Sequence, residues 1–501
     1  MADEVFDVLI LGAGPAGLTA AYLLTRDSPS KVVVLEKSPD YVGGISRTER
    51  CGDYLFDIGG HRFFSKSREV EDLWREILPN DFLERPRSSR IFYKGKFYSY
   101  PLRSFEALRN LGLIESTLCV ASYFRARLFP VRDPHSFHQW VANQFGERLF
   151  RIFFKTYTEK VWGMSCDALS ADWAAQRIKG LSLATAVWSG VRKSLGWSGG
   201  SSRGGVVKTL IERFRYPRKG PGMMWEAART KIVAQGGRVE MGTAGEAYLW
   251  HADRALWEVR TRRADGSQES WFARHVISSA PLREVVSAVQ PTPRCAGQVA
   301  GLGYRDFITV AIMLNARPGF TDNWIYIHEK AVKVGRIQNF SSWSEEMVPG
   351  QNSGCLGLEY FCFEGDSLWT MPDEQMIAMA IGELETLGLA RAGQVVGGRV
   401  VRQPKAYPVY DDTYKSVIAA VREEFAANYP ALHFVGRNGM HKYNNQDHAM
   451  MTAMLTVRNI LAGTPKYDVW AVNEDAEYHE EARAGEEAKA GGNTQGNRNA
   501  A

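Results

Sequence analysis

Three glycines and one acidic residue near the start of the chain have the spacing of a dinucleotide-binding turn. Gly12, Gly14 and Gly17 form a Gly-x-Gly-x-x-Gly pattern directly after the apolar run at residues 8–11. Glycines at these positions allow a tight turn, close approach of the backbone to a pyrophosphate, and close packing of a helix on a strand. Glu36 follows a second apolar run about 20 residues further on, where a carboxylate binds a ribose hydroxyl. The pattern predicts a dinucleotide site, and the alternative is a chance glycine turn.

A second glycine-rich stretch, at residues 43–48, supplies further groups for the same ligand. Gly44 and Ser46 are small enough to bring backbone N–H groups close to a diphosphate, and Arg47 adds a positive charge. The alternative interpretation is a glycine-rich surface turn, because paired glycines also mark turns.

These residues need a strand, a helix and a second strand to position them, and residues 1–70 show that order of patterns. Two short aromatic runs, 90–93 and 97–100, then surround a Lys-Gly-Lys turn and predict a β-hairpin. Residues 104–195 are predicted to be mainly helical. The Gly/Ser-rich stretch at 196–205 is expected to be mobile and is a candidate lid.

Several segments in the second half of the chain are expected to belong to the same domain as the dinucleotide-binding turn. A helix is expected at 222–235, and a strand follows at 236–241. Residues 248–263 and 269–277 alternate like antiparallel strands around a glycine turn. Residues 275–281 are predicted to form a buried strand that meets the nucleotide domain. A last strand is expected at 433–437, with a helix after it.

The expected fold class is α/β, with a Rossmann-type dinucleotide-binding domain made of discontinuous segments, a helical domain and an antiparallel β-sheet substrate domain. The domains are assigned to residues 1–90, 222–300 and 430–465 (Rossmann-like), 104–221 (helical), 91–103 and 301–429 (sheet), and 473–501 (a disordered tail poor in large apolar residues).

The composition argues against several other classes of protein. The chain has 501 residues and a formal net charge of +5, without a run of like charges, so no nucleic-acid partner is predicted. Its six cysteines are scattered without a Cys-x-x-Cys pair, which predicts neither a metal site nor a disulfide framework and favours a reducing cytoplasm. No apolar run reaches the ~18 residues that a membrane span needs.

An apolar stretch at residues 111–129 is interrupted by Glu115, Arg125 and Arg127. We interpret this stretch as a packed helix of the helical domain. The alternative is a helix that lies on a membrane surface.

Several segments beyond the glycine motif resemble the UDP-galactopyranose mutase family, especially its longer, eukaryotic-type branch within the amine oxidase-like FAD superfamily. The resemblance covers most of residues 5–460. It rests on Gly59-Gly60-His61-Arg62-Phe63-Phe64-Ser65, Lys160-Val161-Trp162, Phe214-Arg215-Tyr216-Pro217, Gly335-Arg336-Ile337, Tyr407-Pro408, Lys442-Tyr443 and Asn445-Gln446-Asp447-His448.

The resemblance implies that the dinucleotide is FAD, active in its reduced form, with NAD(P)H as a candidate reductant. His61 would lie against the flavin ring near N5. The residues expected at the cofactor are Gly12, Gly14, Ala16, Gly17, Glu36, Lys37, Gly44, Ser46, Arg47, Gly60, His61, Arg90, Gly436, Arg437, Asn445 and Gln446.

The same resemblance implies a nucleotide-diphospho-sugar substrate. The residues expected to bind it are Tyr100, Arg103, Tyr157, Trp162, Arg177, Arg336, Tyr407 and Tyr443. In the family, the equivalents of Arg336 and the last two tyrosines bind the diphosphate. The residue types agree with that role, because a guanidinium and two phenols suit a cluster of phosphate oxygens. The segment 214–217 is expected to enter the same pocket.

The sequence departs from the family pattern at two places. Arg103 stands where a glutamine that reads the uracil edge is expected. Residues 211–213 stand where the family has small polar residues, including an asparagine at the sugar. The sugar and the base are therefore left open.

The activity that the resemblance implies is a pyranose–furanose interconversion without net redox change. Flavin N5 is the nucleophile at the anomeric carbon, and the nucleotide diphosphate leaves and returns. His61, Arg177 and Arg336 are the expected catalytic residues, with Arg336 helping to hold the departing diphosphate in place.

A redox flavoenzyme related to the amine oxidases, desaturases or porphyrinogen oxidases is the alternative. In such an enzyme flavin N5 accepts hydride, and Tyr407 and Tyr443 wall an aromatic cage. Arg336 argues against this alternative, because a hydrophobic or amine substrate does not favour a cation. A flavin-binding protein with a structural role is a third reading, which the density of pocket-type residues disfavours. The oligomeric state is left open.

Overall fold

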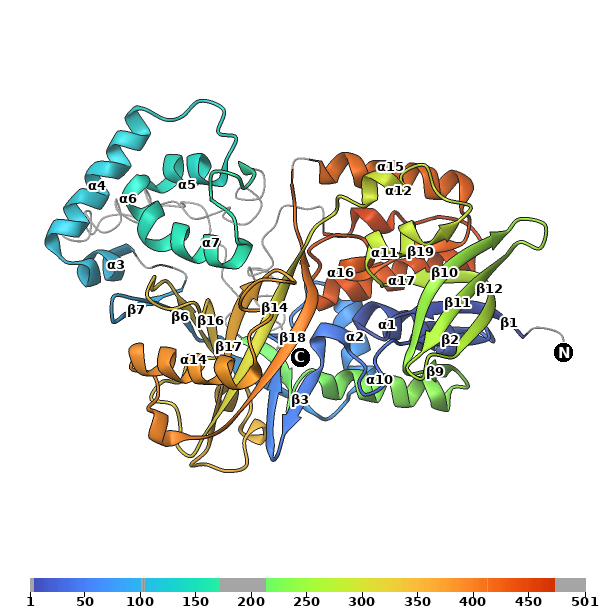
Figure 1. The fold of residues 1–501 in the computed structure, drawn as a ribbon, viewed down its shortest axis with the longest axis horizontal. Helices are drawn as coiled ribbons and strands as arrows, with labels where there is room; N and C mark the ends of the chain where they lie inside the picture. The colour runs from blue at the N-terminus through green and yellow to red at the C-terminus, as the bar shows by residue number, and fades with distance from the viewer. Residues whose placement is uncertain (1–3, 101, 103, 172–212, 412, 474–501) are drawn as a thin grey trace, which may run out of the picture.

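Two large β-sheets, two small strand pairs and a group of helices make up the described part of the protein, in a computed structural model that describes residues 4–100, 102, 104–171, 213–411 and 413–473. In Figure 1 the dinucleotide-type sheet lies at the right, the second sheet at the lower left, and the helical part above the second sheet. The predicted fold class, a Rossmann-like α/β domain with a separate, mainly antiparallel sheet, is confirmed.

The first sheet has five parallel strands at its centre. They are β19 (Leu432–Phe434), β12 (Gln268–Ser278), β1 (Val5–Leu11), β2 (Val32–Leu35) and β9 (Arg238–Glu240), in this spatial order. All four residues of β2 are buried, as expected of a parallel strand covered on both faces. The strands expected at 236–241, 275–281 and 433–437 overlap β9, β12 and β19, which join the sheet that holds the glycine motif, whereas Gly436 and Arg437 belong to the helix α16.

Helices and further strands cover this parallel core. One face packs against α1 (Pro15–Asp27), α10 (Gly222–Ala234) and α17 (Gln446–Ala462). The other face packs against α11 (Leu282–Ser287), α12 (Ala296–Val299) and α15 (Tyr414–Asn428). The sheet continues beyond β12 through β11 (Leu256–Arg263), β10 (Thr243–His251) and β13 (Val289–Gln290). The expected strand at 248–263 is thus two strands, separated by a turn in which Ala255 has a φ of 48°.

The second sheet has the order β18 (Val395–Pro408), β14 (Tyr304–Leu314), β17 (Gly354–Cys362), β16 (Arg336–Asn339), β15 (Trp324–Ile327), β6 (Ser89–Tyr93) and β7 (Lys96–Ser99). Every pair is antiparallel except β15 with β6. Every residue of β14 and β17 is buried, and α14 (Asp373–Thr386) covers one face. The predicted hairpin around Gly95 is confirmed as β6 and β7.

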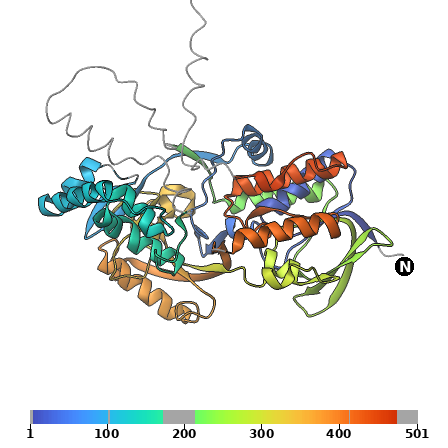
Figure 2. The same cartoon turned by 90° about the horizontal axis from the view of Figure 1, so that it is seen from above.

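The helical part lies beside the second sheet, at the end of the molecule opposite to the N-terminus (Figure 2). It contains α3 (Ser104–Leu111), α4 (Leu113–Leu128), α5 (Phe137–Phe145), α6 (Glu147–Phe150), a π-turn (Arg151–Lys155) and α7 (Thr156–Trp162). Ser136 and Gln139 form a capping box that starts α5. The candidate lid at 196–205, Arg103 and Arg177 lie outside the described residues.

Two small antiparallel pairs and short helices connect the sheets. They are β3 (Thr48–Cys51) with β4 (Tyr54–Asp57), β5 (Phe82–Pro86) with β8 (Arg213–Pro217), α2 (Arg68–Ile77), α13 (Phe340–Trp343) and α16 (Gly436–Gly439). Within the described ranges, every helix is too short or too polar to cross a membrane.

Candidate active site

The three glycines of the motif occupy three different environments. Gly12 has a φ of +92°, a left-handed conformation that favours glycine. A Cβ on Gly17 would lie 1.9 Å from the carbonyl oxygen of Gly12, so this position permits the close packing of α1 on β1. A Cβ on Gly14 would meet nothing within 4 Å. The backbone at Gly14 is therefore open to a ligand at the N-terminus of α1, where a diphosphate is favoured.

Two distant segments converge on this turn. The N–H of Gly43 donates to the carbonyl oxygen of Ala13 at 2.8 Å, and a Cβ on Gly44 would lie 3.5 Å from the Cα of Gly14. Gly436, with a φ of +76°, approaches the Cβ of Ala16. The structure thus brings together three of the segments expected at the cofactor.

Glu36 is buried and directed toward the glycine turn. Its carboxylate accepts from the backbone N–H of Ala13 at 2.7 Å and from that of Ser38 at 2.9 Å. These bonds hold the carboxylate beside the open backbone, which fits the role of a ribose ligand. Ser46 is buried in the adjacent turn, whereas Lys37 is exposed.

Two arginines expected at the cofactor have protein partners instead. Arg47 is 4% exposed and pairs with Glu49 at 2.7 Å, and it also donates to the side chain of Gln403 at 2.7 Å. Its guanidinium therefore joins the first part of the chain to β18. Arg90 pairs with the buried Asp322 at 2.6 Å and does not line the pocket described below.

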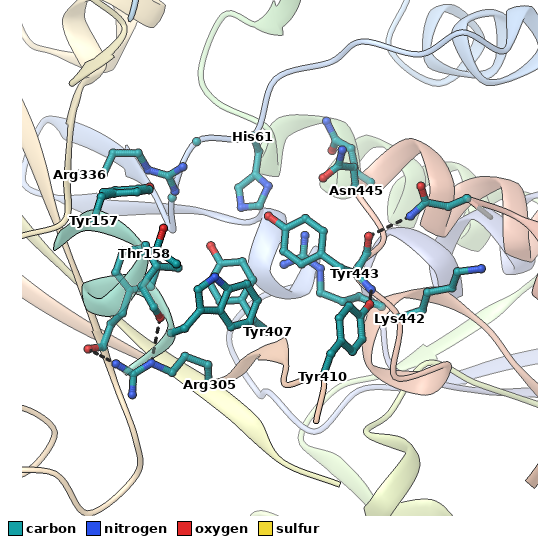
Figure 3. Close-up of a pocket in the computed structure, with 18 of the residues that line it drawn as sticks. His61, Tyr157, Thr158, Arg305, Arg336, Tyr407, Tyr410, Lys442, Tyr443 and Asn445 are labelled. Carbon is teal, nitrogen blue, oxygen red and sulfur yellow. Dashed lines mark hydrogen bonds between the residues drawn. The ribbon is translucent and has the colours of Figure 1, made fainter. Parts of the chain in front are cut away.

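A cavity of about 740 Å³ lies where the two sheets and the helical part meet. Figure 3 shows Arg336 and Tyr157 on one side of His61, and Tyr443 and Asn445 on the other. The expected site residues that line this cavity are Gly60, His61, Tyr100, Tyr157, Trp162, Arg336, Tyr407, Arg437, Tyr443, Asn445 and Gln446. Among the described lining residues, seven are Arg or Lys and one, Asp447, is acidic.

Arg336 is held in the cavity by a buried carboxylate. It lies opposite Glu359 in the antiparallel pairing of β16 with β17, and its Nε donates to Glu359 Oε2. Glu359 is fully buried and also accepts from Gln338 Nε2 at 2.8 Å. Burial raises the pKa of Glu359, against the attraction of the guanidinium. The ion pair fixes the guanidinium beside the cavity, where it can bind an anion.

Tyr407 and Tyr443 lie face to face, with ring centroids 5.6 Å apart and an interplanar angle of 12°. The guanidinium of Arg437 lies over both rings, 5.4 Å from the centre of Tyr407 and 5.0 Å from that of Tyr443. Burial, together with the neighbouring phenol, raises the pKa of Tyr407 to about 12. The hydroxyl of Tyr407 therefore stays protonated at neutral pH and can donate to an oxygen-rich ligand.

The helix α7 places Tyr157 and Trp162 in the wall of the cavity. Tyr157 stacks on His328 at 5.2 Å and meets Tyr326 edge-on at 5.3 Å. The C-terminus of α7 is held by Arg305, which donates to the carbonyl oxygen of Val161 at 3.0 Å. A cation at the carbonyl end of a helix is stabilising, so Arg305 helps to fix the indole of Trp162 in the cavity wall.

Lys160, which belongs to the same family-like segment as Trp162, is not among the described residues that line the cavity. Its ammonium donates to the carbonyl oxygen of Ile327 at the end of β15 and to two carbonyls of the loop that follows, including that of Glu329 at 2.6 Å. Burial lowers the pKa of Lys160 to about 8. This residue anchors α7 to the second sheet.

His61 lies at the centre of the cavity on the loop that follows β4. Its Nε2 bonds to the carbonyl oxygen of Ile58 at 2.9 Å. Burial, with Arg437 and Arg336 nearby, lowers the pKa of His61 to about 4, so the imidazole is neutral at pH 7.

The N-terminus of α17 also faces the cavity. Asn445 precedes the helix, and its backbone N–H donates to Nδ1 of His448 in the first turn at 3.2 Å. Gln446 donates from Nε2 to the carbonyl oxygen of Arg62 at 2.9 Å, and its Oε1 is buried without a partner. Gln338 Oε1 is likewise buried without a partner in the described cavity wall. Two such acceptors fit a planar heterocycle that carries an N–H group, such as an isoalloxazine ring.

The segment 214–217 was expected to enter the pocket, but in the structure it lies outside the cavity. Tyr216 is fully buried, and its hydroxyl donates to Asp57 Oδ2. Phe63 pairs with Arg215 through a β-bridge. The segment supports the loop that carries His61, because both ends of that loop, Asp57 and Phe63, bond to it. None of its residues lines the cavity.

We expect Asp57→Asn to change how stability depends on pH. Asp57 is buried and accepts from Thr48 Oγ1 at 2.9 Å, and burial raises the pKa of its carboxyl to about 7. Unfolded Asp has a pKa of about 3.9, so stability from this group is present below about pH 4 and is lost as pH rises toward 7.

Stability from buried histidines such as His61, whose pKa is lowered, increases as pH rises over this range, which is opposite to the effect of Asp57. The measurement is therefore the difference between the variant and the wild type in urea unfolding from pH 4 to 7. The variant should gain stability relative to the wild type as pH rises, and a constant difference would contradict the assignment.

Sequence reasoning missed several residues that line the cavity or support it. Trp324, Tyr326 and His328 alternate along β15 and its end, and all three face the cavity. Their period of two is a signal that could have been read. Glu359 carried no such signal, because its role depends on strand pairing. Asn473, expected to begin a disordered tail, lines the cavity and donates to the carbonyl oxygen of Tyr443 at 3.0 Å.

Comparison with known proteins places the fold in a large group. Residues 10–77 match the model of the NAD(P)-binding Rossmann-like domain. A crystal structure of reduced UDP-galactopyranose mutase superimposes with a TM-score of 0.79 and 20% identity, over 95% of this chain and 99% of that one. The fold is that of the amine oxidase-like superfamily of FAD- and NAD(P)-binding Rossmann proteins.

Curated relatives in this superfamily have different activities. Coproporphyrinogen III oxidase of Mycobacterium tuberculosis is 24% identical over 439 residues, which are 82% of this chain and 89% of that protein. The dTDP-fucopyranose mutase of Escherichia coli is 27% identical over 176 residues, which are 31% of this chain and 42% of that protein. The similarity to that mutase thus spans less than half of its length.

Proposed function

We propose that the protein is an FAD-dependent mutase that interconverts the pyranose and furanose forms of a nucleotide-diphospho-sugar. The observation that carries the proposal is the cationic cavity wall in which Arg336, Tyr407 and Tyr443 lie close to His61. A guanidinium and two phenols suit the oxygens of a diphosphate.

The proposed cofactor site runs from the glycine turn to the central cavity. Gly14 and Gly44 would adjoin the diphosphate of FAD, and Glu36 would bind its ribose. Gln446 and Gln338 offer unpaired acceptors near the proposed ring position. When bound in its reduced form, the flavin supplies the nucleophilic nitrogen that the ring interconversion needs.

The residues of the chain would perform the remaining tasks. Arg336 and the two tyrosines would bind the diphosphate and keep it beside the sugar after it departs. Tyr157 and Trp162 would form an apolar wall for the sugar ring. The positive end of α17 would stabilise negative charge on the reduced ring, although Asp447 in its first turn offsets part of this effect.

A redox enzyme is the second candidate, and one comparison favours it. The coproporphyrinogen III oxidase relative matches 82% of this chain, a larger share than the dTDP-fucopyranose mutase matches. A porphyrinogen with carboxylate side chains would also suit a cationic cavity. The cavity therefore disfavours an uncharged or amine substrate more strongly than it disfavours a porphyrinogen.

The deciding experiment offers the FAD-loaded protein pyranose and furanose forms of UDP-galactose and dTDP-fucose, with and without dithionite. The expected result is that the two forms of either sugar nucleotide interconvert only after reduction. Chromatography detects the products. Coproporphyrinogen with oxygen is offered in parallel. Oxidation of this compound, without interconversion of any sugar nucleotide, would overturn the proposal in favour of the oxidase.

A further inference from the structure

The outward side of α4 carries several large exposed apolar side chains, with the exposed Thr117 and Arg125 between them. Helical periodicity places Leu113, Phe124 and Leu128 on one line, with Ile114 and Leu118 beside it. Leu113 is 86% exposed and Ile114 is 80% exposed. We call the group of exposed apolar residues Leu113, Ile114, Leu118, Phe124, Leu128, Phe129 and Val131 the α4 face.

Exposed apolar side chains concentrate on this face rather than being scattered. Of the eleven large hydrophobic residues that are exposed in the described chain, seven belong to the α4 face. The opposite side of the helix is anchored, because Cys119 and Tyr123 are buried. A concentration of exposed apolar side chains of this kind is typical of an interaction site.

The charges around the α4 face are mainly positive, with the exposed Asp133 beside Arg132 as an acidic neighbour. Arg125, Arg127 and Arg132 are exposed at its C-terminal end, and Lys94 is exposed on the hairpin turn near its N-terminal end. Glu115, the acidic residue of the helix, is paired with Arg148 at 2.5 Å. An apolar strip with a cationic border is complementary to a surface that is apolar inside and anionic outside.

We propose that the α4 face binds reversibly to membranes that contain anionic phospholipids. The helix has 16 residues, about 24 Å at 1.5 Å per residue, which is shorter than the ~30 Å hydrocarbon core. It therefore lies in the membrane plane, with its apolar side chains among the acyl chains and its arginines at the headgroups. The helix is at the outer end of the molecule, so the face can meet a flat surface (Figure 1).

A second copy of the chain is a poorer occupant of the α4 face. A two-fold interface places the same patch on both partners, so the arginines at the C-terminal end of one helix would meet either the same arginines or Lys94 of the other copy. Like charges at close range oppose such an arrangement, whereas anionic headgroups neutralise it. This inference is independent of the activity proposed above, because no residue of the α4 face lines the cavity.

The test is flotation of the full chain with vesicles of phosphatidylcholine alone or mixed with phosphatidylglycerol. The wild type should float with the mixed vesicles and be released by high salt. The triple variant Ile114→Glu/Leu118→Glu/Leu128→Glu should bind at least roughly a hundredfold more weakly. Arg125→Gln/Arg127→Gln/Arg132→Gln should also lose roughly a hundredfold on the mixed vesicles.

The matched control is Val233→Glu/Val396→Glu, which adds the same kind of charge at apolar residues exposed elsewhere, 54% and 56% respectively. It should bind like the wild type, and urea unfolding should show that every variant is folded. Absence of wild-type binding, or equal loss in the control, would overturn the proposal. The proposal would also be overturned if neither protein binds vesicles and the wild type sediments as a dimer while the triple glutamate variant sediments as a monomer.

Discussion

Arg336→Ala is expected to weaken UDP binding by about 1.5–3 kcal/mol and to lower the free energy of unfolding by about 3–5 kcal/mol. The first effect follows from the proposed diphosphate contact. The second follows from Glu359, which is 0% exposed and would lose its guanidinium partner. A buried carboxylate without a partner is costly, and it lowers that cost by taking up a proton.

The pH dependence distinguishes this cause from a simple loss of packing. Without Arg336, the pKa of Glu359 in the folded state is raised further above its unfolded value, because burial already raises it. Stability from such a group is present below the unfolded pKa and is lost as pH rises. The variant should therefore be closer to the wild type in acid than at pH 7, as measured by urea unfolding.

A double variant separates stability from ligand binding. Arg336→Met/Glu359→Gln removes both charges and keeps an acceptor for the Gln338 amide, which donates to Glu359 in the wild type. It should recover most of the lost stability, because neither charge remains buried alone. It should not recover UDP binding in calorimetry. Wild-type affinity in the double variant would remove Arg336 from the diphosphate site and weaken the case for the mutase.

The local patterns of the sequence predicted the fold well because they depend on short-range rules. A glycine turn after an apolar strand, and paired aromatic runs around Gly95, determine their own local structure and are found as expected. The strands predicted at 275–281 and 433–437 overlap β12 and β19, because each contains a short apolar run of the kind that a covered parallel strand carries.

The missing parts of the site depend on strand register and on tertiary contacts. Arg336 meets Glu359 only because β16 and β17 pair in one register, and a shift of one residue would turn each side chain to the other face. Arg47 was expected at a diphosphate, yet it pairs with Glu49 and Gln403, a residue more than 300 positions away in the chain. A charge pattern shows that a cation is present, and the fold decides which anion it meets.

The apolar stretch 111–129 also shows which features the local sequence determines and which depend on tertiary contacts. Its periodicity indicated a helix, and the structure contains α4 there. Both readings of that helix were open because apolar residues occur on more than one side of it. Burial of Cys119 on one side and exposure of Leu128 on the other make it a packed helix with a free apolar face. The contact that turns one side inward comes from the neighbouring helices, which the stretch itself does not specify.

Substitution of two glycines in one turn is expected to separate folding from cofactor binding. In Gly17→Ala, the new Cβ would lie 1.9 Å from the Gly12 carbonyl oxygen, so α1 must move away from β1, at a cost of about 3 kcal/mol. In Gly14→Ala, the new Cβ meets nothing within 4 Å and φ is −80°, which alanine adopts readily. The free energy of unfolding of the cofactor-free protein should change by no more than about 0.5 kcal/mol.

Both variants should be purified with little flavin, but for different reasons. The methyl group of Gly14→Ala would occupy the space through which the proposed diphosphate approaches the backbone, whereas Gly17→Ala would distort the turn itself. Flavin absorbance per protein measures how much cofactor each variant retains, and urea unfolding of the cofactor-free proteins measures how far the substitution destabilises the fold. Full flavin content in Gly14→Ala would show that no diphosphate lies over this turn. Normal stability in Gly17→Ala would show that contact between α1 and β1 does not require a glycine.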